Sequence, residues 1–202
     1  MAEEQTMNRP FPLPRLARVL AAALGCLLAF ACASTPIYVP TTLAVSFVPG
    51  TEPPPGVSVT LQPGDVTDTL ARVRVSAQGT QDFFGAAFWI TYDITSVAFT
   101  GYDDSASFLR DDGSTVTLQV DPLSKPGTIK VGFTRVQNGE GTVQGVDVTV
   151  ARDLIVLEFG PRKVVEASPI VFASGHGEVV GSGMPPSNTI EATWVGGSFS
   201  AR

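Results

Sequence analysis

Trp89 is the side chain with the clearest capacity for binding in this chain of 202 residues. The run from Ala86 to Tyr92 alternates between two sets of side chains, which is typical of a strand with one buried face. Alternation directs Phe88 and Ile90 inward, and it therefore directs Trp89 and Thr91 outward. An outward Trp marks a protein interface or a flat surface on which a sugar ring can stack. In the alternative interpretation, a loop or the segment before the domain covers Trp89.

Motifs for catalysis are missing from the sequence. It contains no Gly-x-Ser-x-Gly, no His-Glu-x-x-His and no glycine-rich phosphate loop. Its single histidine, His176, excludes a zinc site built on two histidines and is expected in a solvated turn between Gly175 and Gly177. We therefore expect a protein that is not an enzyme and has no cofactor.

Two acidic runs invite a calcium site but are also typical of turns. They are Asp103-Asp104 and Asp111-Asp112-Gly113. Calcium prefers several oxygen ligands, whereas Asp and Gly are the residues that tight turns require. We favour the turns and expect no metal.

The charge balance limits the class of partner. The chain has 13 Lys and Arg against 19 Asp and Glu, a net charge of −6, and only 16% of its residues are charged. This balance argues against a nucleic-acid partner, because binding to phosphates needs a basic face. The 44% hydrophobic content is too high for a disordered chain.

A period of two residues dominates the chain after residue 56. Apolar residues alternate with other residues in several short runs, namely 57–61, 71–77, 86–92, 116–120, 129–133 and 155–159. Turn residues such as Pro63-Gly64-Asp65 and Lys125-Pro126-Gly127 separate the runs. This pattern predicts an all-β domain, an antiparallel sandwich or barrel of eight to ten strands.

The N-terminal segment, residues 1–31, is predicted to be an export signal. Arg15 and Arg18 precede a run of 13 mostly apolar residues, 19–31, which is too short to span a bilayer. The run ends in Ala29-Phe30-Ala31-Cys32, which resembles the bacterial lipobox, whose cysteine is acylated and becomes the first mature residue. We therefore expect an exported protein that is lipid-anchored to the cell envelope through Cys32.

Two alternatives remain for the signal. Cys26 is a rival attachment site, although only a short apolar run precedes it. An ordinary signal peptide could also end near Ala31 or Ala33. Since Ala33 is not the Asp that retains some lipoproteins at the inner membrane, the outer membrane or cell surface is the expected location.

Residues 32–56 are predicted to be a proline-rich tether, followed by the domain at 57–202. The tether contains the run Pro53-Pro54-Pro55, and such runs favour an extended, semi-rigid chain. The apolar residues 44–48 leave open a first strand or a packing arm within this segment.

Several ordered segments resemble the cohesin family. An aromatic-Gly-Ala strand ends in Tyr92-Asp93, and a second strand begins at Val97. Further strands follow at 127–135 and 154–159, and a closing segment at 193–199 contains two glycines. The resemblance implies a jelly-roll sandwich of about nine strands with a Gly-Gly bulge in its closing strand. It also implies a non-catalytic module that binds a dockerin-like protein partner in extracellular assembly or polysaccharide degradation.

The resemblance places further side chains beside Trp89. If the family's sheet order holds, Lys130, Thr134, Thr117 and Gln119 share its outer surface with Trp89 and Thr91. The family commonly presents polar side chains where this sequence has Gly85 and Ala87. Direct carbohydrate binding at the same surface, or a purely structural role in the envelope, therefore remain as alternatives.

We predict that mass spectrometry of the mature N-terminus will find Cys32 as its first residue, carrying a diacylglycerol on its sulfur. The reason is that the apolar run ends in small residues directly before this cysteine. An unmodified N-terminus elsewhere would contradict the prediction.

Overall fold

The computed structural model describes residues 43–53, 55–67, 69–136, 143–183 and 188–202. The predicted signal peptide and Cys32 lie outside these residues. Residues 42–202 form one compact unit. The described part of the chain holds no helix that is long and apolar enough to cross a membrane.

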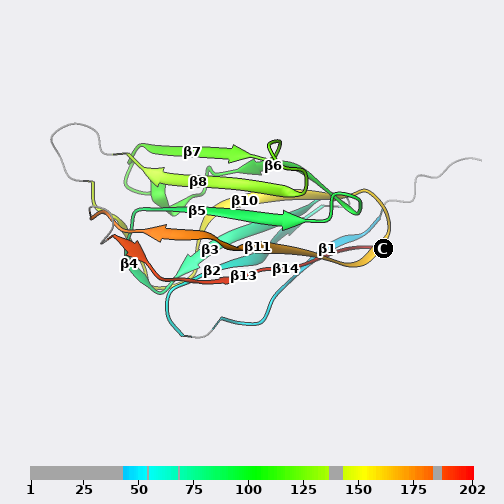
Figure 1. Ribbon diagram of the computed structural model, residues 1–202, viewed down its shortest axis with the longest axis horizontal. Helices are drawn as coiled ribbons and strands as arrows, with labels where there is room; N and C mark the ends of the chain where they lie inside the picture. Colours follow the sequence, from blue (N-terminus) through cyan, green and yellow to red (C-terminus); the bar gives the residue numbers. More distant parts are fainter. Residues whose placement is uncertain (1–42, 54, 68, 137–142, 184–187) are drawn as a thin grey trace, which may run out of the picture. The chain divides into compact units, whose positions relative to one another are not determined.

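Two sheets make up the domain (Figure 1). The first sheet has the order β1 (Val45–Pro49), β14 (Gly197–Ala201), β11 (Val165–Val180), β5 (Gly85–Tyr92), β8 (Thr128–Arg135) and β7 (Val116–Asp121), with β12 (Thr189–Ile190) also paired to β11. The second sheet has the order β13 (Thr193–Val195), β2 (Ser58–Val66), β3 (Ala71–Gln78), β10 (Arg152–Pro161) and β6 (Val97–Asp103). Two short strands, β4 (Thr80–Phe83) and β9 (Val146–Val148), form a separate ladder, and the 3-10 helix η1 spans Phe108–Arg110.

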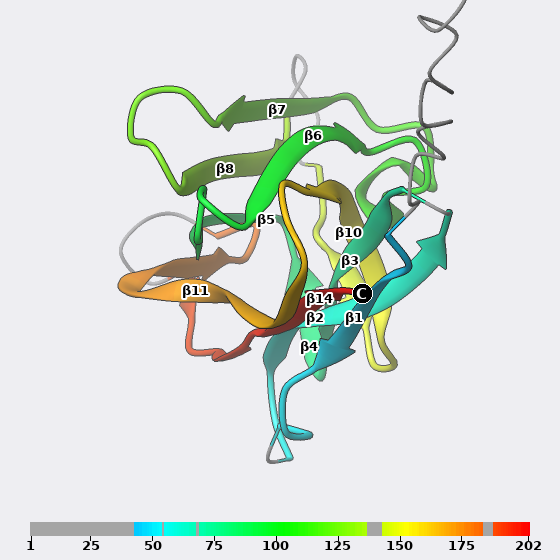
Figure 2. The ribbon, with the colours of Figure 1, turned by 90° about the vertical axis from the view of Figure 1, so that its right-hand side faces the viewer.

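The predicted sandwich is confirmed, because these two sheets lie as layers over one core (Figure 2). Their strand pairs are antiparallel, except that β13 runs parallel to β2. The described residues contain more strands than the expected nine or so. The additional ones include two- and three-residue strands such as β12 and β9, which are too short to show alternation in a sequence.

Alternation correctly identifies the core. Phe88 and Ile90 of β5 are fully buried, as are Val73 and Val75 of β3. Each such side chain contributes about 1.5–3 kcal/mol when it leaves water. Hydrophobic burial between the two inner faces therefore holds the layers together.

An aromatic cluster joins the two sheets beneath β5. Trp194 of β13 lies 5.8 Å from Phe88 and 5.0 Å from Phe172, measured between ring centroids. The prediction that Trp194 faces inward is confirmed, since it packs against the core. Gly177 makes room for it, because a Cβ at this position would lie 2.4 Å from Cε2 of Trp194.

The closing segment differs from the expected single strand with a bulge. It forms β13 in the second sheet and β14 in the first, so the chain changes sheets at Gly196. A Cβ at Gly196 would lie 2.8 Å from the carbonyl oxygen of Ile170, so the crossing requires a residue without a side chain.

The predicted tether boundary at residue 56 is wrong for residues 45–49. They form β1, which pairs with β14 and buries Val45 and Phe47. Two backbone hydrogen bonds between Ala44 and Arg202 extend this pairing. The alternative of a first strand is therefore correct, and the folded domain begins before residue 57.

We predict that Phe47→Ala lowers the free energy of unfolding by about 3–5 kcal/mol, because it leaves a cavity in the core. The adjacent Val48→Ala serves as the control and should change stability by less than about 0.5 kcal/mol. Phe47 is 5% exposed and Val48 is 58% exposed. Urea unfolding measures both, and equal midpoints for the two variants would place β1 outside the cooperative fold.

Candidate functional site

The outer face of the first sheet brings the predicted binding residues together. Four neighbouring strands, β11, β5, β8 and β7, run side by side across it (Figure 1). Trp89 is paired with Lys130, which is paired in turn with Asp121. We call these three residues, together with His176, the ridge.

A second row of residues crosses the same four strands next to the ridge. Glu178 is paired with Ala87, Ala87 with Gly132, and Gly132 with Gln119. We call this row the furrow, because its two central residues have a methyl group or no side chain. A Cβ added at Gly132 would meet no atom within 4 Å, so the space above it is open.

The remaining predicted residues lie on the same face. Thr134 is paired with Gly85 on one side and with Thr117 on the other. Thr91 is paired with Thr128 one row beyond the ridge, and its hydroxyl lies 3.4 Å from the carbonyl oxygen of Val171. The sheet thus collects Trp89, Thr91, Lys130, Thr134 and Gln119 on one surface.

Trp89 points outward as predicted, but its indole is already engaged within the domain. The imidazole of His176 is stacked on it, with ring centroids 3.8 Å apart and planes within 5°. The Lys130 ammonium lies 5.0 Å from the indole centroid. Since β11 and β8 flank β5 on opposite sides, the two groups approach the ring from opposite sides. Trp89 is therefore not a free platform for a sugar ring.

His176 is a site residue that the sequence did not reveal. It lies within β11 and not in a separate turn, and its side chain is exposed. The pairing of β11 with β5 shifts register between Phe172 and Gly177, and Gly175 within this stretch has a φ of 73°. The irregular stretch carries His176 onto Trp89. Only the unusual Gly-His-Gly sequence could have suggested it.

The outer face of the second sheet is different, because its charges pair with one another. Arg72 lies 2.7 Å from Asp103 and 3.4 Å from Glu158. Arg74 lies 3.3 Å from Asp153, which also accepts a 2.6 Å hydrogen bond from Ser76. No ion pair among the described residues involves the outer face of the first sheet.

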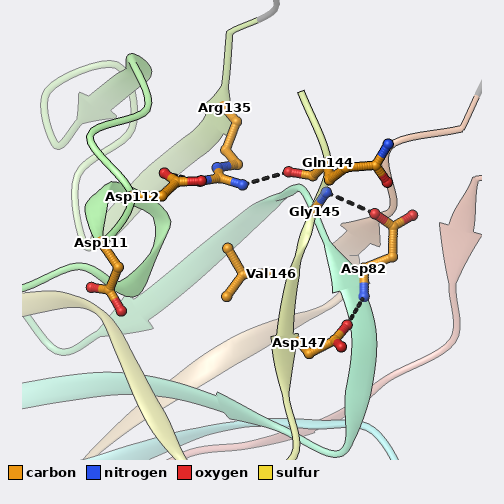
Figure 3. A pocket seen from close by; sticks show the side chains of 8 residues that line it. All are labelled: Asp82, Asp111, Asp112, Arg135, Gln144, Gly145, Val146 and Asp147. Atoms are coloured by element: carbon orange, nitrogen blue, oxygen red, sulfur yellow. Dashed lines mark hydrogen bonds and ion pairs between the residues drawn. The ribbon is translucent and has the colours of Figure 1, made fainter. Parts of the chain in front are cut away.

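A hollow of about 420 Å³ lies where β4, β9 and the segment after η1 meet (Figure 3). Its lining includes Arg135, which is 3% exposed. The guanidinium donates to the carbonyl oxygens of Leu109 and Gln144 and forms an ion pair with Asp112. Arg135 thus joins three segments of the chain at the end of β8.

Asp82 is a second residue of this hollow that connects separate segments of the chain through hydrogen bonds. Its carboxylate accepts a hydrogen bond of 2.8 Å from the backbone N–H of Gly145, and bonds of 2.9 and 3.0 Å from the N–H and hydroxyl of Ser182. Its own N–H donates to Asp147 (Figure 3). Burial raises the pKa of Asp82, but the bonds from Ser182 and Gly145 outweigh it, so the pKa lies below its ordinary value of 3.8.

The acidic runs of the sequence are used in turns and ion pairs. Asp111 pairs with Arg152, and Asp104 with Arg110. Hydrogen bonds from Ser114 and then from Arg135 hold the pKa of Asp112 well below its usual range. Within the described ranges, no group of three or more His, Cys, Asp or Glu side chains is placed to hold a metal ion.

Comparison with solved structures identifies the architecture. A cohesin module of a family 33 glycoside hydrolase from Clostridium perfringens aligns with a TM-score of 0.50 at 12% identity, over 73% of this chain and 96% of that one. A type II cohesin domain from the cellulosome of Acetivibrio cellulolyticus aligns with a TM-score of 0.51 at 13% identity, over 71% of this chain and 95% of that one. The chain has the fold of a cohesin.

Other comparisons add a further structure but no family assignment. A type I cohesin from Pseudobacteroides cellulosolvens gives a TM-score of 0.50 at 13% identity, over 77% of this chain and 90% of that one. No family model matches the sequence, and no curated protein matches it. The cohesin likeness therefore concerns the fold.

Gly85 departs from the polar pattern of cohesins for a steric reason. A Cβ at this position would lie 2.8 Å from the Cβ and hydroxyl of Thr134. The close pairing of β5 and β8 in this cohesin-like domain leaves no room for a side chain there.

We predict that Asp82→Asn lowers the free energy of unfolding by about 1–2 kcal/mol at neutral pH. The amide keeps only one acceptor oxygen and has no charge, so either Gly145 or Ser182 loses its hydrogen-bond acceptor. Asn also tolerates the φ of 60° at this position, so the backbone stays unstrained. Because folding lowers the pKa of Asp82, its contribution is present above pH 3.8 and is lost as the pH falls through the folded-state pKa.

The measurement is urea unfolding of both proteins between pH 7 and pH 3. The difference between them should shrink toward the acid end. Asp65→Asn, at an exposed position of β2, is the control and should differ little from the unsubstituted protein at any pH. A difference for Asp82→Asn that is constant with pH would contradict the assignment.

Proposed function

We propose that this protein is a non-catalytic binding module that captures a dockerin-like protein partner through the outer face of its first sheet. The observation that carries the proposal is the contrast between the two faces. The second sheet pairs Arg72 and Arg74 with acids of its own strands. In the first sheet, exposed Glu178 in the furrow and half-buried Lys130 on the ridge form no ion pair with any described residue. The cohesin fold supports the same assignment.

The relief of the face also suits a protein partner. The furrow lets a partner's backbone approach Ala87 and Gly132 closely, and the ridge beside it offers a rigid aromatic side chain. In protein interfaces a few residues, often aromatic, carry most of the binding free energy, and the contacts around them mainly exclude water. A sugar would first have to displace His176 from Trp89, so we place carbohydrate binding second.

Localisation completes the proposal. The predicted signal at 1–31 and the lipobox around Cys32 support export and anchoring at the cell surface. A lipid-anchored module of this kind would hold a secreted partner, such as a polysaccharide-degrading enzyme, at the envelope. A passive structural role would need no open face.

We predict that Gly132→Arg reduces the affinity for the partner at least tenfold, because a long side chain would fill the furrow. The position has free space, so the variant should fold normally. Thr100→Arg, at an exposed position of β6 in the second sheet, is the matched control and should bind as the unsubstituted protein does.

The assay is biolayer interferometry against recombinant dockerin modules from the same genome, with a glycan array in parallel. If Gly132→Arg and Thr100→Arg bind the dockerin modules with equal affinity, the outer face of the first sheet is not the binding surface. Binding to the glycan array with no protein capture would favour the carbohydrate alternative. A genome without any dockerin sequence would count against the dockerin-like partner.

A further inference from the structure

A second hollow opens at the β11 end of the furrow. It has a volume of about 430 Å³ and is lined by residues of β5, β11 and β12. Trp89 and His176 form its aromatic wall, and Glu178 and Thr189 supply its polar groups. The hollow thus combines flat rings, a carboxylate and a hydroxyl on the face that we propose as the interface.

Glu178 is oriented within this hollow. The Thr189 hydroxyl donates a hydrogen bond of 3.0 Å to Oε1 of Glu178. The carboxylate forms no ion pair with any described residue. A carboxylate with two oxygens and about four lone-pair sites retains acceptor capacity after one such bond. It is therefore available to a donor that enters the hollow.

The carboxylate of Glu178 and the rings of Trp89 and His176 favour a planar cation in this hollow. Glu178 is the only Asp, Glu, Lys or Arg side chain among the described residues that line the hollow, so the hollow itself carries a negative charge. Guanidinium groups are planar, stack on aromatic rings and donate two parallel hydrogen bonds to a carboxylate. The ammonium of lysine is a compact, strongly hydrated charge and makes neither contact as well.

We propose that this hollow is the subsite for an arginine side chain of the protein partner. Its guanidinium donates to Glu178 while its flat face lies against the exposed imidazole of His176. This inference rests on the proposed function, because it assigns the chemistry of one contact within the same interface. It makes Glu178 and His176 specificity-determining residues of that contact.

The test uses N-acetyl-arginine amide as the probe and fluorine NMR of the full chain labelled with 5-fluorotryptophan. The chain has only two tryptophans, so Trp89 reports on the hollow while Trp194 serves as the internal control. We expect millimolar arginine amide to shift the Trp89 signal and to leave the Trp194 signal in place. Trp89→Phe assigns the two signals.

Matched probes and variants separate a specific site from general effects. The neutral isostere N-acetyl-citrulline amide should give no saturable shift, and the lysine analogue should bind more weakly. Glu178→Gln should weaken arginine binding about tenfold, since the contact is a charge-assisted hydrogen bond. Glu166→Gln, at an exposed position of the same strand, should leave it unchanged.

Each outcome decides the matter. Equal shifts with arginine and citrulline, no shift at Trp89, or unchanged binding in Glu178→Gln would overturn the subsite. If arginine amide does not shift the Trp89 signal but Gly132→Arg abolishes partner capture, the arginine subsite is contradicted and the proposed interface is not. If the probe binds as expected while Gly132→Arg leaves capture intact, the proposed interface falls instead.

Discussion

The contact between Trp194 and the backbone of Gly177 is the constraint on which the candidate site depends. It joins β13 of the second sheet to β11 of the first, at a point where no Cβ could fit. The pairing of β11 with β5 shifts register just before this point. On the opposite face, the same irregular stretch places His176 over Trp89. Packing in the core and chemistry at the surface are therefore set by one glycine position.

Charge is distributed between the two faces according to a similar division. The second sheet uses its arginines to neutralise its own acids, which leaves it little capacity to attract a charged partner. These pairs are partly buried, and because each charged group has a partner in its own sheet, the charges of that face are largely neutralised. On the first sheet, neither Glu178 nor Lys130 forms an ion pair with a described residue, and the central residues of the furrow, Ala87 and Gly132, are small.

Sequence alone predicted the features that depend on alternation. The inward direction of Phe88 and the outward direction of Trp89 follow from the period of two, and so does the sandwich. Prediction from the sequence failed where contacts between residues far apart in the chain decide the structure. Prolines near β1 concealed a strand that is stabilised by pairing with β14 and by burial of Val45 and Phe47. Asp82 gave no signal, because its three donors come from residues more than 60 positions away.

The pairing of β1 with β14 gives the domain an almost circular chain. The N–H of Ala44 donates to the carbonyl oxygen of Arg202, and the N–H of Arg202 donates to that of Ala44. In Figure 1 the C-terminus lies at the end of β1. A short peptide could bridge these two residues without disturbing either sheet, and new ends could then be opened in an exposed connection between the sheets, such as the one around Val164 between β10 and β11. A circularly permuted chain, with its strands in a different order along the sequence, should therefore form the same two sheets.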